Sequence, residues 1–268
     1  MTDPKALRSY YREQLEDAER MYGDRRRAFH QWRRLRVARR ILKERLPPLS
    51  RVLEVGCGDG YAMAQLLEGL PVGQYVGLDL SSHKLQAAKK RRPSGLFLVA
   101  DSLGCPVADN SCDAVLLFEV LEHLPDPVAA LREVHRMLRE GGVFFSSVPV
   151  DAPWAEALVR LGRSLRRRRG GRGRRGRKRS FNEHLHFITR AGLRRWLEEA
   201  NLDLMEAEPC VFHYPLLEPL SAWVPFGVLE AVDRALVRVR LDAFGPGGAL
   251  GLSLGSEYLV LCARKAGG

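Results

Sequence analysis

Hydrophobic and polar positions follow two different periods along the chain. From residue 4 to 46, apolar and aromatic residues recur at helical spacing with charged residues between them. A Gly-Asp pair at 23–24 indicates a break between two helices, and two prolines at 47–48 end the second. From residue 51 onward, short apolar runs typical of buried strands alternate with helical segments.

Seven segments are predicted to be strands: 51–55, 74–80, 95–100, 112–120, 142–150, 202–212 and 256–264. Helices are predicted at 61–69, 83–91 and 125–138, the last ending at two glycines, and after Thr189, whose hydroxyl can cap the helix. This alternation predicts an α/β fold, a doubly wound and mostly parallel seven-stranded sheet. N-terminal helices and a C-terminal helical excursion would flank the sheet.

The same pattern predicts how the chain is organised. We expect an N-terminal helical lid at 1–48 and a Rossmann-like, cofactor-binding core at 49–150. Residues 151–182 carry an Arg/Gly-rich insertion that cannot bury itself, so we expect it to be disordered. Residues 183–268 are expected to complete the sheet and the substrate side of the same domain.

Most of the positive charge lies in one segment. The formal net charge is +11, and residues 160–179 hold twelve of the 43 Lys and Arg without any acid, so the rest of the chain is nearly neutral. Such a run can bind the phosphates of RNA, an anionic membrane surface or an acidic substrate. It has no aromatic residues to stack on bases, so a solvated loop without a specific partner stays an open alternative.

Cysteine usage and hydropathy narrow the class of protein. The five cysteines are scattered and form no C-x-x-C pair, so we expect small buried side chains, no disulfide framework and no metal site. No apolar run is long enough to be a transmembrane segment, and the N-terminus lacks the apolar core of a signal peptide. The expected location is the cytoplasm, with peripheral membrane association as an alternative.

The stretch "VLEVGCGDG" at 52–60 is the strongest motif. Its glycines occupy every second position, and an acid stands two residues before the first of them. A dinucleotide-binding turn needs G-x-G-x-x-G, and Tyr61 replaces its third glycine. The pattern instead resembles the first motif of class I S-adenosylmethionine (SAM) methyltransferases, which would make SAM the cofactor.

The resemblance covers roughly 35–150, including E-x-x-E-H-L-P-D-P at 119–127, and continues at 183–202, which is similar to UbiE-like (type 11) small-molecule methyltransferases. Asn201 departs from the family's glycine, but Asn also tolerates the left-handed conformation that ends a helix. An acid after the second strand would hold the ribose, and one after the third would meet adenine. The resemblance implies these cofactor-binding residues: Glu54, Gly56, Cys57, Gly58, Gly60, Asp79, Leu80, Asp101, Ser102 and Glu119.

Three histidines are candidate catalytic residues. His123 follows the fourth strand at the cleft end of the sheet, where it could act as a base or pack the turn. His184 and His186 point to the same side if the backbone is extended. They could bind or deprotonate a substrate, fix a loop, or bind a metal if a third ligand existed. Of Glu119 and Glu122, we expect one to line the methionine pocket and the other to face solvent.

The acceptor is less well defined by the sequence. The D/N-P-P-Y/F motif and the cysteine nucleophile of nucleic-acid base methyltransferases are absent after the fourth strand. The predicted function is therefore methyl transfer from SAM to an O, N or C atom of a small or lipid-like acceptor. The alternatives are an RNA-directed methyltransferase tethered by the basic insertion and a non-catalytic SAM-fold binding protein. Several aromatic residues could either line the site or pack: Tyr10, Tyr11, Tyr22, Trp32, Trp223 and Phe226.

Overall fold

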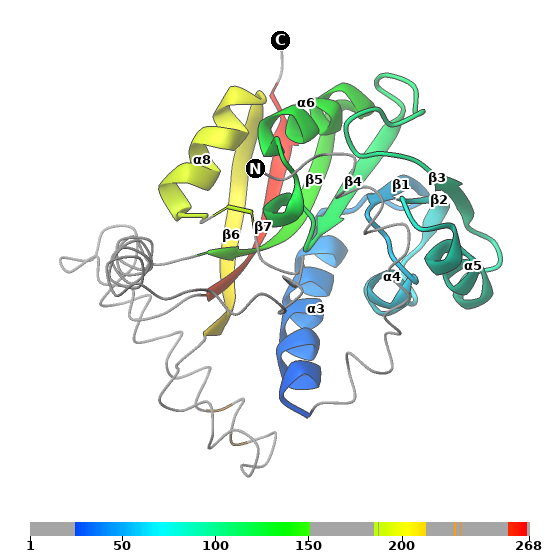
Figure 1. The fold of residues 1–268 in the computed structure, drawn as a ribbon, viewed down its shortest axis with the longest axis horizontal. Helices are drawn as coiled ribbons and strands as arrows, with labels where there is room; N and C mark the ends of the chain where they lie inside the picture. Colours follow the sequence, from blue (N-terminus) through cyan, green and yellow to red (C-terminus); the bar gives the residue numbers. More distant parts are fainter. Residues whose placement is uncertain are drawn as a thin grey trace, which may run out of the picture.

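The computed structural model describes residues 25–150, 185–186, 188–212 and 257–266, with isolated positions 228 and 231. These residues form a seven-stranded sheet with helices on both faces (Figure 1). The strand order is β3-β2-β1-β4-β5-β7-β6. The doubly wound α/β fold predicted from the sequence is therefore confirmed.

The first five strands are parallel, and β7 runs antiparallel to both β5 and β6. The strands are β1 (Ser50–Val55), β2 (Val72–Asp79), β3 (Leu96–Val99), β4 (Cys112–Phe118), β5 (Leu138–Val150), β6 (Leu202–Phe212) and β7 (Glu257–Lys265). The described helices are α3 (Arg25–Arg45), α4 (Tyr61–Leu66), α5 (Ser82–Arg91), the short 3-10 turn η1 (Leu121–His123), α6 (Pro127–Met137) and α8 (Arg190–Glu199).

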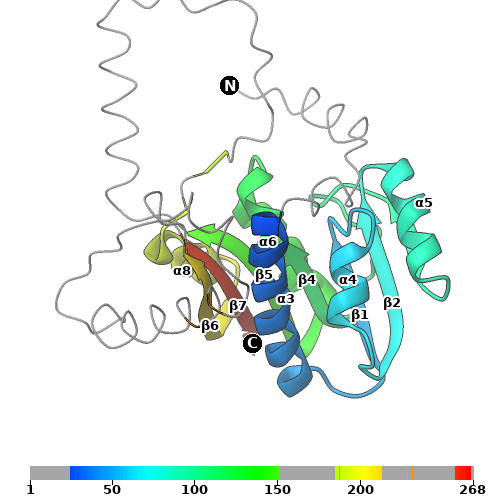
Figure 2. The same ribbon diagram turned by 90° about the horizontal axis from the view of Figure 1, so that it is seen from below.

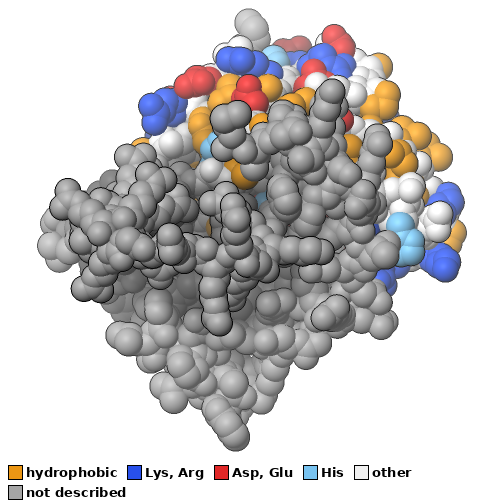
Figure 3. Space-filling view, viewed as in Figure 1, with side chains coloured by type: hydrophobic (Ala, Val, Ile, Leu, Met, Phe, Trp, Pro, Cys, Tyr) orange, Lys and Arg blue, Asp and Glu red, His pale blue; other side chains and the backbone are white. Residues whose placement is uncertain are grey.

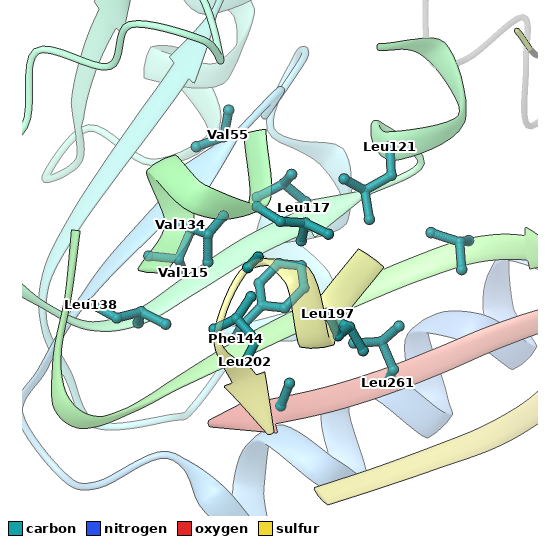
Figure 4. Close-up of a cluster of buried hydrophobic side chains, with 14 of the residues drawn as sticks. Val55, Val115, Leu117, Leu121, Val134, Leu138, Phe144, Leu197, Leu202 and Leu261 are labelled. Atoms are coloured by element: carbon teal, nitrogen blue, oxygen red, sulfur yellow. The ribbon is translucent and has the colours of Figure 1, made fainter. Parts of the chain in front are cut away.

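Two hydrophobic cores lie on opposite faces of the sheet. Successive residues of a strand point to opposite faces, and β4 follows this rule: Ala114 and Leu116 face α3 and α4, whereas Val115 and Leu117 face α6 and α8. Figure 2 shows α3 and α4 side by side on one face. Figure 4 shows part of the other core, where side chains from β1, β4, β5, β6, β7, α6, α8 and η1 converge.

The main difference from the sequence prediction lies between α6 and β5. The predicted helix at 125–138 ends at Met137, and β5 begins at the next residue and runs through both glycines. Cys112 of β4 pairs with Leu138, and Ala114 already pairs with Val143, so the glycines lie in an irregular stretch of the ladder. Strand pairing, a tertiary contact, therefore starts β5 at Leu138, four residues before the predicted start at 142.

Several smaller local predictions are borne out, and one helix differs in length. Thr189 caps α8 by accepting a hydrogen bond from the backbone amide of Gly192. Asn201 adopts a left-handed φ of 54° just after α8. The predicted helix at 61–69 is shorter than expected and ends at Leu66. Four of the five cysteines have described side chains, and all four are free and buried.

Other predictions concern residues or side chains outside the described part. These are the insertion at 151–182, most of the helical excursion between β6 and β7, and the side chains of His184, Tyr10, Tyr11, Tyr22, Trp32, Trp223 and Phe226. The domain boundaries and the lid role of residues 1–48 stay predictions. None of the described helices combines the length and the apolar character that crossing a bilayer requires.

Candidate functional site

The glycine loop after β1 has a backbone that strongly favours glycine. Gly56, Gly58 and Gly60 have φ values of 74°, 55° and 75°, in the left-handed region. A Cβ on Gly56 would lie 2.6 Å from Cγ2 of Val120, so this glycine lets the loop pack against the segment after β4. A Cβ on Gly58 would meet nothing within 4 Å, so open space remains where a ligand can approach the backbone.

Asp79, at the end of β2, holds this loop. One carboxylate oxygen accepts a hydrogen bond from the backbone amide of Gly58 and the other from that of Ser81, both at 2.8 Å. The amides of Gly56 and Cys57 donate to the carbonyl of Leu78 at 2.7 and 2.9 Å. The loop after β1 and the end of β2 therefore form one unit, with Leu80 in the chain between Asp79 and Ser81.

The turn after β3 adjoins the same edge of the sheet. The amide of Ala100 donates to the carbonyl of Asp79 at 3.2 Å. The carboxylate of Asp101 accepts hydrogen bonds from the amide of Leu103 at 3.1 Å and from the Ser102 hydroxyl at 3.4 Å. The structure thus brings together the sequence-predicted acids after strands two and three.

Glu54 lies inside the sheet, behind the loop. It is only 2% exposed, and the Tyr75 hydroxyl donates to its Oε2 at 2.6 Å. Burial raises the pKa of Glu54 to about 7, and the nearby carboxylates of Asp79 and Asp59 act in the same direction, whereas the hydrogen bond from Tyr75 opposes it. Glu54 supports the loop from the core side.

Glu119 stands where β4 ends, in a strained conformation. Its φ is 57°, which is uncommon for a residue with a side chain. Its Oε1 accepts a hydrogen bond from the Ser147 hydroxyl of β5 at 2.7 Å. Its Oε2 lies 2.5 Å from Nη1 of Arg34, a residue of α3 whose side chain is 8% exposed. Three elements therefore meet at this carboxylate.

Glu122, in η1, is completely buried. Neither of its carboxyl oxygens has a hydrogen bond of normal geometry from any described residue. Burial first, and the charge of Glu119 second, raise the pKa of Glu122 well above its usual range, while its own backbone amide and Arg34 act in the opposite direction. Of the two glutamates, Glu122 is the enclosed one, because η1 turns position 122 inward, whereas the side chain of Glu119 is 28% exposed. Which of them lines the methionine pocket stays a prediction.

Two of the candidate histidines lie around this turn. His123 Nε2 is 3.9 Å from Oε1 of Glu122. His186 has its Nε2 2.8 Å from the carbonyl of Leu124, and its ring packs edge-on against Trp196 with centroids 5.6 Å apart. These contacts support the loop-fixing alternative for His186. Among the residues that the structure describes, no three His, Cys, Asp or Glu side chains are arranged to hold a metal ion.

Arg34, Tyr75 and Ser147 contact the site but were not among the sequence candidates. Arg34 had a usable signal, because it lies three, four and seven residues before buried Val37, Ala38 and Ile41, on the apolar face of α3. An arginine on such a face needs a carboxylate partner. Nothing in the local patterns around Tyr75 and Ser147 distinguishes them from other strand residues.

A cavity of about 360 Å³ lies elsewhere, at the amino-terminal ends of β1 and β4. Its lining includes Arg51, Gln74, Phe97 and Val107. Open α/β sheets bind ligands beyond the carboxyl ends of their strands. The site therefore lies at the opposite edge from this cavity, at the glycine loop and the turn after β4.

Comparisons with known proteins identify the family of this chain. A family model described as "Methyltransferase domain" matches residues 24–207. A ubiquinone biosynthesis O-methyltransferase of Xanthomonas oryzae is 32% identical over 177 residues, which cover 61% of this chain and 66% of that protein. The match thus spans a little less than two thirds of that relative's length.

Solved structures show the same fold at low sequence identity. Geranyl diphosphate C-methyltransferase from Streptomyces coelicolor, solved with Mg²⁺, geranyl diphosphate and S-adenosyl-L-homocysteine, aligns with a TM-score of 0.57 at 15% identity, over 96% of this chain and 88% of that chain. The [4+2]-cyclase SpnF aligns with a TM-score of 0.54 at 20% identity, over 87% and 82%. Since SpnF is described as a cyclase, the fold alone does not assign a reaction.

Proposed function

Because the chain belongs to the class I SAM-dependent methyltransferase family, we propose that it transfers the methyl group of SAM to an O, N or C atom of a small or lipid-like acceptor. The observation that carries this proposal is the contact between two parts of the site. Gly56 of the glycine loop packs on Val120, in the turn that holds Glu119 and the buried Glu122. The glycine loop thus adjoins the turn that carries His123, the candidate base.

The cofactor of this family is SAM, and the residues of this chain fit it. Open space above Gly58 allows close approach to the backbone. We assign Asp79 and Leu80 to the ribose side, Asp101 and Ser102 to adenine, and Glu119 to the methionine end. SAM supplies a methyl group already activated by a sulfonium, so positioning and the exclusion of water are the protein's main tasks.

An acceptor hydroxyl must also lose its proton. His123 and Glu122 are neighbours on η1, at the carboxyl end of β4. The side chain of His123 is 23% exposed, whereas that of Glu122 is enclosed. In this proposal His123 takes the proton. His186 keeps the turn in place through the carbonyl of Leu124.

A small or lipid-like acceptor is supported by what the similar proteins are described to act on. One is an O-methyltransferase of ubiquinone biosynthesis, and another methylates geranyl diphosphate. On the face drawn in Figure 3, the described basic and acidic side chains lie among one another rather than in a patch of one sign. We assign any binding of RNA or of an anionic membrane to the basic run at 160–179, and we keep the cytoplasm as the proposed location.

The test is a methyl-transfer assay with the full chain and methyl-labelled SAM. Three acceptor classes are offered: phenols and catechols with and without a prenyl chain, bulk tRNA, and anionic phospholipid vesicles. We expect label in a phenolic or prenylated acceptor, with matching release of S-adenosylhomocysteine. A variant lacking 163–179 should keep this activity. Label in tRNA alone, lost with the deletion, would overturn the proposal in favour of the RNA-directed alternative.

A further inference from the structure

An arginine of the N-terminal helix reaches into the site. Arg34 lies on the face of α3 that packs on the sheet, and its side chain is 8% exposed. Its Nη1 lies 2.5 Å from Oε2 of Glu119, at the end of β4. A buried guanidinium is costly without a charged partner, so this pair is a defined feature of the packed core.

Glu119 needs external support to keep its shape. Its backbone has a φ of 57°, and such a conformation persists only where the surrounding structure holds it. The two carboxylate oxygens are held from different elements, one by Ser147 of β5 and one by Arg34 of α3. The amide of Glu119 also donates to the carbonyl of Ser147 at 3.0 Å.

The residues after Glu119 contact both the glycine loop and the segment that carries His186. Val120 packs on Gly56 of the glycine loop. The carbonyl of Glu122 accepts a hydrogen bond from the amide of Leu185 at 2.9 Å, next to His186. A change at Glu119 would therefore move both the donor loop and the turn that carries the candidate base.

We propose that Arg34 is a positioning residue for methyl transfer, which through its ion pair with Glu119 holds the turn after β4 in the shape that the bound cofactor requires. The inference rests on the proposed function in assigning Glu119 to the methionine end of SAM. The inference adds that the packing of α3 on the sheet and the affinity of the site for SAM depend on each other. Arg34 acts through Glu119 and needs no contact with SAM itself.

The charges around Glu122 predict a pH dependence of SAM affinity. A role of Arg34 in packing alone would not change this pH dependence. The groups that face Glu122 are Arg34 from α3, Glu119 from the end of β4, His123 from its own turn, and the segment carrying His186. Arg34 lowers the pKa of Glu122 and Glu119 raises it. Since SAM is a cation at sulfur, its affinity should rise as Glu122 ionises. Removing the arginine and neutralising Glu119 should shift that rise in opposite directions.

Arg39 offers a matched control on the same helix. It donates to the carbonyls of Gln65 and Glu68, at 2.7 and 2.6 Å, near the end of α4. Arg39 therefore also ties α3 to the domain, but at the end of α4 and without a described contact to Glu119. Arg39→Ala should reduce stability without changing the site.

The experiment is calorimetric titration of SAM into the full chain across pH 5.5–9, for wild type, Arg34→Ala, Arg34→Lys, Glu119→Gln and Arg39→Ala. We expect Arg34→Ala to weaken SAM about tenfold, the loss expected for one contact to a charged group. Arg34→Lys should recover most of it, and Arg39→Ala should stay close to wild type. The pH at which the SAM affinity rises should be higher in Arg34→Ala than in wild type, and lower in Glu119→Gln.

The outcomes separate this inference from the proposed function. Equal affinity and equal pH profiles for wild type, Arg34→Ala and Arg39→Ala would overturn the inference while leaving the proposed function intact. A folded wild type that does not bind SAM would overturn the proposed function itself. If Arg34→Ala does not fold, Glu119→Gln decides, because it removes the charge that pairs with Arg34 and keeps a hydrogen-bonding group. An affinity and a pH profile equal to those of wild type in Glu119→Gln would then overturn the inference.

Discussion

Two buried glutamates lie near the carboxyl ends of two neighbouring strands of the sheet, yet their surroundings differ. Glu54 of β1 is 2% exposed and accepts a hydrogen bond from Tyr75 at 2.6 Å. Glu122, just after β4, is 0% exposed and has no hydrogen bond of normal geometry from any described residue. Buried polar groups are nearly always satisfied, and exceptions concentrate at functional sites. The comparison suggests that Glu54 completes the scaffold and that Glu122 serves the reaction.

The largest expected effect is on the pH dependence of stability. The pKa of Glu54 is raised from 4.5 to about 7 in the folded protein. A carboxyl with a raised pKa contributes stability below its unfolded pKa and loses it as pH rises through the folded pKa. This loss amounts to about 3 kcal/mol between pH 4.5 and 7. Denaturant unfolding of wild type and Glu54→Gln across this range should show a difference of this size and sign.

A flat difference between wild type and Glu54→Gln would contradict the prediction. Glu122 has the same sign, since its pKa is also raised, so part of the pH dependence should persist in Glu54→Gln. The double variant with Glu122→Gln should remove that remainder. If the stability of the double variant still depends on pH, other groups dominate this pH range.

The next effect separates the two glutamates at pH 5, where both are largely protonated. Glu54→Leu leaves the Tyr75 hydroxyl buried without its acceptor and should cost about 2 kcal/mol of unfolding free energy. Glu122→Leu removes an unsatisfied buried acid and should leave stability unchanged or raise it by about 1 kcal/mol, while methyl transfer falls. Urea unfolding and the labelled-methyl assay measure both. Equal destabilisation by the two substitutions would remove the contrast.

The smallest effects concern the segments that hold the turn of Glu122. His186→Ala removes the contact with the Leu124 carbonyl and should cost about 1 kcal/mol, with SAM affinity retained. Asp126→Ala is the control, because its carboxylate caps α6 by accepting from the Ala129 amide at 2.9 Å, also worth about 1 kcal/mol. Thermal unfolding and SAM calorimetry are the measurements. Turnover lost in His186→Ala but kept in Asp126→Ala, with SAM still bound, would assign His186 a substrate-side role instead.

The scaffold around Glu54 could be predicted from the sequence because its determinants are local. Alternating glycines after an apolar run force a left-handed loop, and a polar residue at the end of the next strand adjoins it by the geometry of a parallel sheet. The cap at Thr189 and the left-handed conformation of Asn201 could be predicted for the same reason, since a helix cap and a helix end depend on neighbouring residues.

The surroundings of Glu122 could not be predicted because they depend on contacts between distant segments. The motif E-x-x-E-H does not show which carboxylate is buried, since the η1 turn decides it. Four strands, β1 to β4, lie between Arg34 and Glu119 in the sequence. Only the place of Arg34 on the apolar face of α3 indicated a buried partner. The start of β5 was misjudged likewise, since its pairing with β4 outweighs the glycines at 141–142.

The most direct test of the central claim is calorimetric titration of SAM into the folded full chain at pH 8, beside Asp79→Ala. Asp79 holds the amides of Gly58 and Ser81, so its loss should open the glycine loop. The account predicts that wild type binds SAM but not NAD, and that Asp79→Ala, still folded by circular dichroism, binds SAM at least about tenfold more weakly. Absence of SAM binding by wild type, or equal binding by Asp79→Ala, would contradict it.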